Sequence, residues 1–518
     1  MRGTTLPELA TLQNQIRNAL AIRNIASALD SVRWFVDSIL TNPRAITRVL
    51  GSEELDALCQ DIAEEIKCSV PRDAADRSGT VIIASELSRA GGHEQVMADI
   101  VNLNLFDSPV TILLTDCFDR ADAAIAEEFA AFNQVEVTTV QGVDSAARLD
   151  SVCKYLCDKA PENLLLFFHH QDTIGFCAAL AAGIPNTIFV HHADHHLSLG
   201  VTCKQFRHVD LANMAFENCR HDFGITDNIY WPLILRNDVG VQNREFNKNH
   251  CWRSCSVGRA DKFAANGYAF DYASLLPKIL KATGGTHVHI GPLSTNLSSS
   301  IEKSFVENGV PLDRVKFISY APSVAQALID ENVDVFLGSF PTGGGKSTIE
   351  AMAAGIPLLM HQNYRHRMFC GADVAYPGAL TWQTEEELFE VLAGLSPEIL
   401  SDHASRSRAC FERNHSSDAL VSAIKSQNCV PPPLIEHPVN QLFFFLDEER
   451  DWRASEESRL VAENKVLALE AEVAELEAEV AELEGRLAGL EEKLTSPRKL
   501  SRELARQLNR RLHGKRLR

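Results

Sequence analysis

The feature that most constrains the fold is a repeated alternation of short apolar runs with longer segments of helical periodicity. Between residues 80 and 235 these runs are TVIIAS, PVTILLT, QVEVTTV, NLLLFFH and NTIFVHH. After Asn237 the alternation restarts with CSVGRADK, THVHIG, RVKFISY, VDVFLGS and IPLLMH. Continuous β-branched runs separated by helix-length segments are typical of parallel sheets with helices on both faces. The sequence therefore predicts an α/β fold with two Rossmann-like, doubly wound domains, and such sheets bind ligands at the carboxyl ends of their strands.

Length and patterning divide the chain into five expected regions. With 518 residues and 45% hydrophobic content, the chain can build several cores. The first 75 residues carry apolar positions at helical spacing, which indicates a helical region. The regions are 1–75 (helical), 76–235 (first Rossmann-like domain), 236–435 (second Rossmann-like domain), 436–495 (linker and coiled coil) and 496–518 (basic amphipathic tail).

The cysteines and the apolar stretches of the chain indicate its cellular compartment. The thirteen cysteines are scattered and form no C-x-x-C, so we expect free thiols in a reducing compartment. The first residues are interrupted by Glu8 and Gln13, which argues against a signal peptide. No stretch approaches the ~18 apolar residues of a membrane span. The sequence therefore predicts a cytoplasmic protein.

The segment FPTGGGKSTIEAMAAGIP, residues 340–357, directly follows one of the apolar runs. It predicts a glycine-rich turn followed by a helix that begins near Ser347. Three consecutive glycines allow a close approach of the backbone to a ligand and positive φ at little cost. A helix start offers unpaired N–H groups and the positive end of the dipole, and the hydroxyls of Ser347 and Thr348 add donors. The segment thus predicts a phosphate or diphosphate site.

Spacing separates two nucleotide-binding interpretations of this segment. The Walker A pattern G-x-x-x-x-G-K-[ST] is not satisfied, because Phe340 stands where the first glycine is required. Glu350, one turn into the helix, could instead accept both hydroxyls of a ribose whose diphosphate lies at the helix N-terminus. A glycine-rich turn without a ligand is the alternative.

This order of residues resembles the donor site of the GT-B nucleotide-sugar glycosyltransferases. In the plant-type enzymes of that class the motif is H-x-G-x-x-S-T-x-E, and Thr342 here replaces the histidine. The matching positions are Gly344, Ser347, Thr348 and Glu350. The protein O-GlcNAc transferases are similar, with a loop of small and hydroxyl residues followed by an acidic residue and A-G-x-P. The missing histidine makes Lys346 the candidate for supplying charge to the phosphate.

The resemblance implies further donor contacts in the second domain. Arg259 and Lys262, after its first strand, are implied to neutralise the diphosphate, since these enzymes generally lack a required metal. An exposed basic loop is the alternative. Gly291, in HIGPLS, is implied to lie near the nucleobase, and Gln362 is the implied sugar contact. The predicted donor-binding residues are Arg259, Lys262, Gly291, Thr342, Gly343, Gly344, Gly345, Lys346, Ser347, Thr348, Glu350 and Gln362. No metal and no cofactor beyond the donor are predicted.

The first domain is expected to hold the acceptor and the catalytic base. His93 and Glu94 follow its first strand, and an imidazole titrates near neutrality, so His93 is the first candidate base and Glu94 the second. A helix-capping role for His93 is the alternative.

A second histidine cluster, VHHADHHLSLG (190–200), resembles a histidine-rich motif of bacterial GT-B enzymes of surface-glycan and protein glycosylation. The resemblance implies that one or two of its polar side chains hydrogen-bond the sugar or the acceptor. Those side chains are His191, His192, Asp194 and His195, of which His192 and Asp194 join the catalytic candidates. The loop lacks the spacing of H-E-x-x-H, so zinc is not predicted there. His169, His170 and Asp172 are expected to line the same cleft.

The carboxyl end carries a heptad seam. Its a positions are Val466, Val473, Val480, Leu487 and Leu494, and its d positions are Leu469, Leu476, Leu483 and Leu490. Valine at a with leucine at d favours parallel dimers. In such a dimer Glu472 would face Glu477 of the other chain and Glu479 would face Glu484, whereas Arg486 and Glu491 attract. These pairs are each a few tenths of a kcal/mol, less than the apolar seam contributes. A homodimer is expected, and a basic hetero-partner is the alternative.

The last segment is basic although the whole chain has a net charge of −19. From Arg498 onward it holds nine Lys or Arg and one acid, Glu503. Leucines 500, 504, 508 and 512 form an i, i+4 stripe beside these cations, a pattern suited to an anionic membrane. A solvated helix and a nucleic-acid contact are the competing interpretations, and nucleic acid is not among the predicted partners.

These observations predict a cytoplasmic, dimeric GT-B glycosyltransferase of polysaccharide biosynthesis, peripheral to the inner face of the membrane. It would transfer a hexosyl or N-acetylhexosaminyl group from a UDP-sugar to a glycan, lipid-carrier or protein acceptor. A non-catalytic scaffold acting through the coiled coil and a nucleotide-sugar epimerase are the alternatives.

Overall fold

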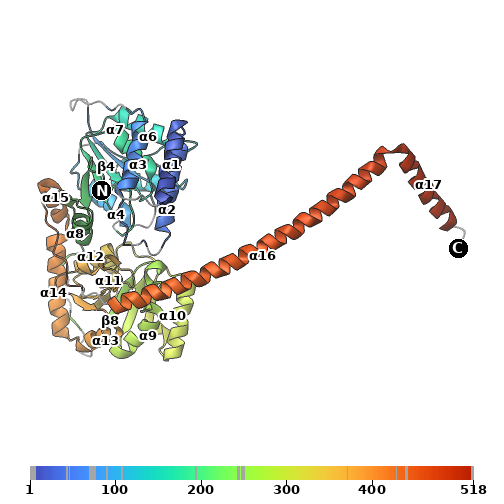
Figure 1. The fold of residues 1–518 in the computed structure, drawn as a ribbon. Coiled ribbons are helices and arrows are strands. Elements are labelled where there is room, and N and C mark those ends of the chain that lie inside the picture. Colours follow the sequence, from blue (N-terminus) through green and yellow to red (C-terminus); the bar gives the residue numbers. More distant parts are fainter. Residues whose placement is uncertain are drawn as a thin grey trace. The chain divides into compact units, whose positions relative to one another are not determined.

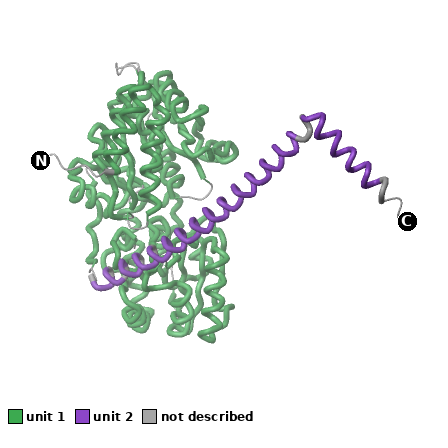
Figure 2. Tube along the Cα trace, turned by 45° about the vertical axis from the view of Figure 1, so that its right-hand side comes forward, with its two compact units in different colours: residues 1–441 green, residues 442–518 purple. Residues whose placement is uncertain are grey.

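The chain forms two compact units, residues 1–441 and 442–518, in a computed structural model (Figure 2). The structure describes residues 7–42, 45, 47–68, 70, 77–88, 92–106, 109–192, 195–241, 245–246, 251–265, 267–369, 371–427, 429–437 and 441–514.

The first sheet of unit 1 has seven parallel strands in the order β3-β2-β1-β4-β5-β6-β7. The strands are β1 (Thr80–Ala84), β2 (Val110–Leu114), β3 (Glu136–Thr139), β4 (Asn163–Phe167), β5 (Thr187–His191), β6 (Arg207–Asp210) and β7 (Ile229–Tyr230). The intervening helices are α4 (Gly92–Asn102), α5 (Ala123–Asn133), α6 (Ser145–Lys159), α7 (Thr173–Ala182) and α8 (Asn213–Asp222). The central strands β1 and β5 are buried along their whole length, which explains their continuous apolar runs.

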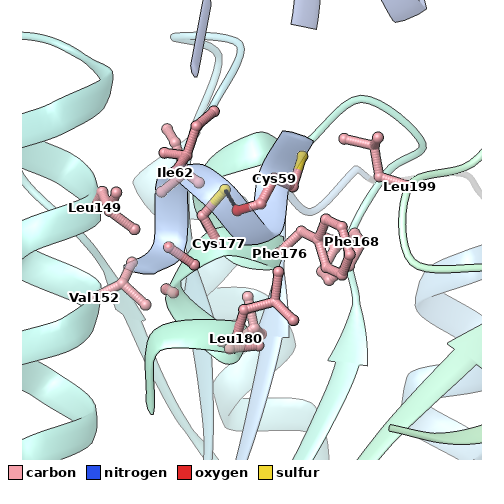
Figure 3. Packing of buried hydrophobic residues seen from close by; sticks show 14 of the residues in the cluster. Cys59, Ile62, Leu149, Val152, Phe168, Phe176, Cys177, Leu180 and Leu199 are labelled. Atoms are coloured by element: carbon pink, nitrogen blue, oxygen red, sulfur yellow. Dashed lines mark hydrogen bonds between the residues drawn. The ribbon is translucent and has the colours of Figure 1, made fainter. Parts of the chain in front are cut away.

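Three N-terminal helices belong to the same core. They are α1 (Pro7–Ala21), α2 (Ile25–Leu40) and α3 (Glu53–Glu64), and α2 and α3 lie against α6 and α7 (Figure 1). Asn24 and Ser52 cap α2 and α3 through their side chains. Figure 3 shows Cys59 and Ile62 of α3 packed with Phe176 and Cys177 of α7 in one apolar cluster. The helical region is therefore an added layer of the first domain.

The second sheet has six parallel strands in the order β10-β9-β8-β11-β12-β13. They are β8 (Arg253–Val257), β9 (Thr286–Ile290), β10 (Val315–Ile318), β11 (Val335–Leu337), β12 (Leu358–His361) and β13 (Leu380–Trp382). The helices are α9 (Tyr272–Thr283), α10 (Thr295–Asn308), α11 (Val324–Asp330), α12 (Gly345–Ala353), α13 (Glu385–Gly394) and α14 (Pro397–Asn414). The order is that of the doubly wound dinucleotide-binding fold.

The chain then crosses back to the first domain. Helix α15 (Ser417–Ser426) buries Leu420 and Ala423 in the apolar cluster that contains residues of β1, β2 and β4. Just before α15, the ring Nδ1 of His415 lies 2.7 Å from the carbonyl oxygen of Leu233. The Asn213 amide of α8 donates to the carbonyl of Asp373, at 2.7 Å. These bonds connect the two sheets' domains within unit 1.

Unit 2 contains α16 (Gln441–Thr495), from its second residue onward, and α17 (Pro497–Gly514). The heptad positions of α16 are exposed in the single chain; Leu476, for example, has 54% of its surface accessible. Pro497 begins α17, as the missing N–H of proline allows at a helix start. Among the described residues, we find no helix with the length and apolar character needed to span a membrane.

Candidate functional site

The strand order of each sheet reverses at one point, between β1 and β4 in the first sheet and between β8 and β11 in the second. In open α/β sheets, ligands bind at the carboxyl ends of the strands that flank such a point. His93 and His169 follow β1 and β4, while Lys262 and the glycine-rich loop follow β8 and β11. The topology therefore places both groups of candidate residues at the switch points.

The glycine-rich loop meets Lys262 at the start of α12. This helix begins at Gly345, two residues before the predicted start, and Gly344 is its N-cap. The φ of Gly344 is −133°, so a positive φ does not explain this glycine. A Cβ at Gly344 would instead lie 2.5 Å from the Ser347 Oγ and 2.8 Å from the Lys262 Nζ. A methyl group at residue 344 would therefore require the Ser347 hydroxyl and the Lys262 ammonium to move from the helix start.

Lys262 is anchored to the loop. Its ammonium donates to the carbonyl of Gly343 at 3.2 Å, and its own carbonyl accepts from the N–H of Thr342, also at 3.2 Å. Burial lowers the pKa of Lys262, partly opposed by the nearby Asp261 carboxylate. Arg259 is 66% exposed at its side chain and pairs with Asp261 at 3.4 Å. Lys262 is therefore the cation held at the helix N-terminus.

Gly258 and Gly291 lie close together where the adjacent strands β8 and β9 end. Gly291 has φ +136°, and a Cβ there would lie 2.1 Å from the carbonyl oxygen of Gly258. Such a contact would force the two backbones apart. This close backbone approach by itself accounts for glycine at 291, and the nucleobase contact of Gly291 stays a prediction.

Glu350 lies in the second turn of α12, half-buried, beside the first residue of α11. The N–H of Val324 donates to its carboxylate. Burial raises the pKa of Glu350 to about 7, although Lys346 and the Val324 amide act in the opposite direction. The carboxylate therefore changes its charge near neutral pH.

Lys346 is bonded to residues of the first domain. Its ammonium lies 2.5 Å from the Asp99 Oδ2 of α4 and donates to the carbonyl of Ile234, both in the first domain. The prediction that Lys346 supplies charge to a phosphate is therefore corrected: the residue connects the two domains of unit 1.

Three other predicted donor contacts are also engaged within the protein. The hydroxyl of Thr348 is buried and donates to the carbonyl of Gly344 at 2.6 Å. The N–H of Gly343 donates to the carbonyl of Phe369. The side chain of Gln362 is buried and donates to the carbonyl of Glu436 at 2.8 Å. The hydroxyl of Ser347 is engaged too, because it donates to the carbonyl of Gly344 at 3.3 Å. The phosphate contacts of Thr348 and Gly343 and the sugar contact of Gln362 stay predictions that would require these bonds to be exchanged.

In the first domain, three histidine rings meet at the ends of β1, β4 and β5. The ring of His93 stacks on that of His192, with centroids 4.5 Å apart, and meets His169 edge-on at 5.1 Å. Burial lowers the pKa of His93 well below its usual value, and the neighbouring histidines add to this effect. Within the described part of the chain, the buried Nε2 of His93 has no hydrogen-bond partner. An uncharged imidazole with an unpaired ring nitrogen can accept a proton.

The structure gives a different outcome for the other candidates in the first domain. Glu94 is buried, and its Oε1 accepts hydrogen bonds from both the N–H and the hydroxyl of Ser88, each at 2.7 Å. Its Oε1 is thus engaged by Ser88, at the end of the described segment 77–88. Asp194 lies outside the described residues. Asp172 does not line a cleft as predicted, because it is fully buried and accepts from the Ser85 hydroxyl at 2.6 Å.

One residue with a clear role was missed. Asp99 was not singled out in the sequence, although it lies among Met97, Ala98 and Ile100 on the buried part of α4. A charged residue among buried positions of a predicted helix is the signal that could have identified it.

No model of a known protein family matches the sequence, and no curated protein matches it. Solved structures do match. A glycosyltransferase from Rickettsia africae is 9% identical with a TM-score of 0.50, and the match covers 68% of this chain and 98% of that one. Anabaena HepE in complex with UDP and glucose is 14% identical with a TM-score of 0.48, over 67% of this chain and 98% of that one. A mutant O-GlcNAc transferase of Thermobaculum terrenum is 13% identical with a TM-score of 0.48, over 86% and 83%.

The likeness to the Rickettsia enzyme shows the fold. Unit 1 has the GT-B fold of the nucleotide-sugar glycosyltransferases, with two doubly wound parallel sheets. The fold class predicted from the sequence is therefore confirmed.

Proposed function

We propose that this protein is a glycosyltransferase that transfers a sugar from a nucleotide-diphosphate sugar to an acceptor. The observation that carries the proposal is the convergence of the Lys262 ammonium, the Ser347 hydroxyl and the Gly344 turn at the N-terminus of α12. A helix start with a cation beside it suits a diphosphate. Its position at the strand-order switch of the second sheet is where such folds bind nucleotides.

The donor would be bound by a few residues with separate roles. Lys262, Ser347 and the first N–H groups of α12 bind the diphosphate, while the Glu350 carboxylate accepts the ribose hydroxyls. Arg259 is exposed and close in sequence to Lys262, so it can reach the outer phosphate oxygens. We take UDP as the nucleotide and a hexosyl or N-acetylhexosaminyl group as the sugar, because the donor loop resembles that of UDP-sugar enzymes.

Transfer forms a bond between the acceptor oxygen and the anomeric carbon. The bond from that carbon to the diphosphate oxygen breaks, and the electron pair leaves with the diphosphate. Lys262 and the α12 amides would stabilise this negative charge. The acceptor proton goes to a base, which we assign to the Nε2 of His93. The lowered pKa keeps this imidazole unprotonated at neutral pH, and it also makes His93 a weaker base than a free imidazole.

Calorimetry of UDP binding tests the donor site. Charge-assisted hydrogen bonds contribute about 1.5–3 kcal/mol, so Lys262→Met should weaken UDP binding about 10- to 150-fold. Ser347→Ala should weaken it less, and Lys303→Met, on the exposed face of α10, is the matched control. Full UDP affinity in both site variants would contradict the assignment.

Turnover separates the three candidate functions. Mass spectrometry of nucleotide sugars incubated with a panel of acceptors should show free UDP together with a glycosylated acceptor. Isomerised donor without released UDP would indicate an epimerase. A protein that binds no nucleotide sugar would be a scaffold.

We also propose that α16 pairs with a second copy of this chain. In the single chain, the valines and leucines of its seam are all about half exposed where their side chains are described. Leu476→Ala with Leu483→Ala should lower the dimer fraction measured by sedimentation. Leu467→Ala is the matched control, because Leu467 lies on the same helix outside the seam. An equal loss of dimer in Leu467→Ala would refute parallel pairing through this seam.

The tail is proposed to bind an anionic membrane surface, which would bring the enzyme to lipid-linked acceptors. Leu500, Leu504 and Leu508 lie on α17 among its cations. Vesicles with phosphatidylserine should retain the full chain at low salt and release it as salt rises. Equal retention on neutral vesicles, or none on either, would contradict the proposal.

A further inference from the structure

Four metal-ligating side chains meet inside the first domain, away from the donor loop. His191 ends β5 and is paired in register with Asp210, which ends the neighbouring strand β6. His208 lies two residues before Asp210 and so shares its face of the sheet. Cys219 lies on α8, the helix that follows β6. All four residues are buried, with at most 5% of their surface accessible.

The potential ligand atoms lie about as close together as the corners of a metal-coordination tetrahedron. The Asp210 Oδ1 lies 3.0 Å from the His191 Nδ1 and 3.1 Å from the His208 Nε2. The Cys219 Sγ lies 3.4 Å from the same Asp210 oxygen and 3.5 Å from the His191 Nδ1. All four atoms lie within 4.8 Å of one another. Zinc bonds of about 2.0–2.3 Å would place the corners of a tetrahedron about 3.3–3.6 Å apart.

Hydrogen bonding alone describes this cluster poorly. The His191 Nδ1, the His208 Nε2 and the Cys219 Sγ all surround one oxygen of Asp210, and the Cys219 Sγ is nearly as close to the His191 Nδ1. A carboxylate oxygen has about two lone-pair positions. The second oxygen is occupied separately, since the Asn228 amide donates to it at 2.6 Å. A cation at the centre would satisfy all four ligand atoms at once, and Asn228 would orient the carboxylate, as outer partners do in metal sites.

We propose that His191, His208, Asp210 and Cys219 bind a zinc ion. On binding, the Cys219 thiol loses its proton to solvent and the two imidazoles bind as neutral rings. One thiolate and one carboxylate then balance the two positive charges, so the buried site is electrically neutral. Four protein ligands fill the tetrahedral positions, which makes the site structural rather than catalytic. The mixture of sulfur, nitrogen and oxygen ligands suits zinc better than magnesium or calcium.

The metal would act on the architecture of the first domain. It would tie the ends of β5 and β6 to α8, and α8 carries Asn213, which bonds to the second domain. His192, directly after the ligand His191, stacks on His93. A zinc ion would therefore hold the backbone that presents His192. This inference does not depend on the proposed transfer reaction.

Metal analysis of the full chain, purified without a histidine tag and desalted, tests the proposal. Plasma mass spectrometry should find about one zinc per chain. Replacement by cobalt(II) should produce visible bands of a tetrahedral ion and a near-ultraviolet charge-transfer band from the Cys219 thiolate. Chelator-treated protein should melt at a lower temperature and regain the original Tm with zinc but not with magnesium.

Two variants assign the ligands. Cys219→Ser should lose the cobalt charge-transfer band and most of the zinc, whereas Cys255→Ser, at another fully buried cysteine, should keep both. Cobalt spectra of the unaltered protein need no variant, so a misfolded Cys219→Ser does not prevent a decision. Unaltered protein without stoichiometric zinc and without a cobalt thiolate band would overturn the proposal. So would full zinc with an unchanged cobalt spectrum in Cys219→Ser.

Discussion

Removing the Lys346 ammonium should destabilise unit 1 without weakening nucleotide binding at a pH where Glu350 is ionised. The Lys346 Nζ lies 2.5 Å from the Asp99 Oδ2, and the side chains are 20% and 7% exposed. Lys346→Met would leave Asp99 buried and without its ion-pair partner. Breaking a buried pair costs about 3–5 kcal/mol. We expect about 3 kcal/mol here, because Lys346 is partly solvated and Arg236 still acts on Asp99.

Urea unfolding followed by tryptophan fluorescence would measure this loss. Asp99→Asn in the Lys346→Met background removes the orphaned charge, so the double variant should be more stable than Lys346→Met alone. Burial already raises the pKa of Asp99, and loss of the ammonium raises it further. A carboxyl with a raised folded-state pKa destabilises the fold at neutral pH and ceases to do so on protonation. The deficit of Lys346→Met should therefore shrink as the pH falls toward about 4.

The same variant tests whether Lys346 has a structural role and Lys262 a nucleotide-binding role. Loss of the Lys346 ammonium also raises the pKa of Glu350, so UDP affinity is compared at about pH 9, where this carboxylate is ionised. There Lys346→Met, under conditions where it is folded, should stay within about twofold of the unaltered protein, whereas Lys262→Met loses at least about tenfold. The reasoning is refuted if Lys346→Met unfolds at the original urea concentration and loses UDP affinity as strongly as Lys262→Met.

The other predictions concern the loop, its carboxylate and the coiled coil. Gly344→Ala should reduce UDP affinity at least about tenfold, since its Cβ would displace the Lys262 ammonium; Gly394→Ala, with no atom within 4 Å of the new Cβ, should not. UDP affinity should rise between about pH 6 and about pH 8, because ionisation of Glu350, with a pKa raised to about 7, lets it accept both ribose hydroxyls. Glu350→Gln should remove this component, and identical profiles for the two proteins would contradict the assignment. Glu477→Lys with Glu484→Lys should tighten the dimer by ~2 kcal/mol, as four repulsive pairs become attractive; sedimentation showing a weaker dimer would exclude parallel pairing.

The GT-B fold could be predicted from the sequence because its signals are local. Each buried strand appears as a short apolar run, and each helix as a segment of 3.6-residue periodicity. Repetition of this pattern predicts the sheet type, since a parallel strand needs a crossover helix. The glycine-rich loop and Lys262 were also identifiable, because both directly follow strands of the second sheet.

The partners of individual side chains could not be predicted in the same way. Lys346 bonds to α4, whereas the hydroxyls of the next two residues, Ser347 and Thr348, both bond to the carbonyl of Gly344 at the start of their own helix. Successive residues of a helix point about 100° apart, so neighbours in the sequence face different surroundings.

The sequence by itself determined the elements of this protein, their order and the loops that follow the strands, because periodicity and turn chemistry act over a few residues. Only the tertiary structure decided which charges meet. It brought Asp99 to Lys346 and gathered His191, His208, Asp210 and Cys219 around one point. These residues come from different elements, and their distances follow from how the sheets and helices pack rather than from their spacing in the chain.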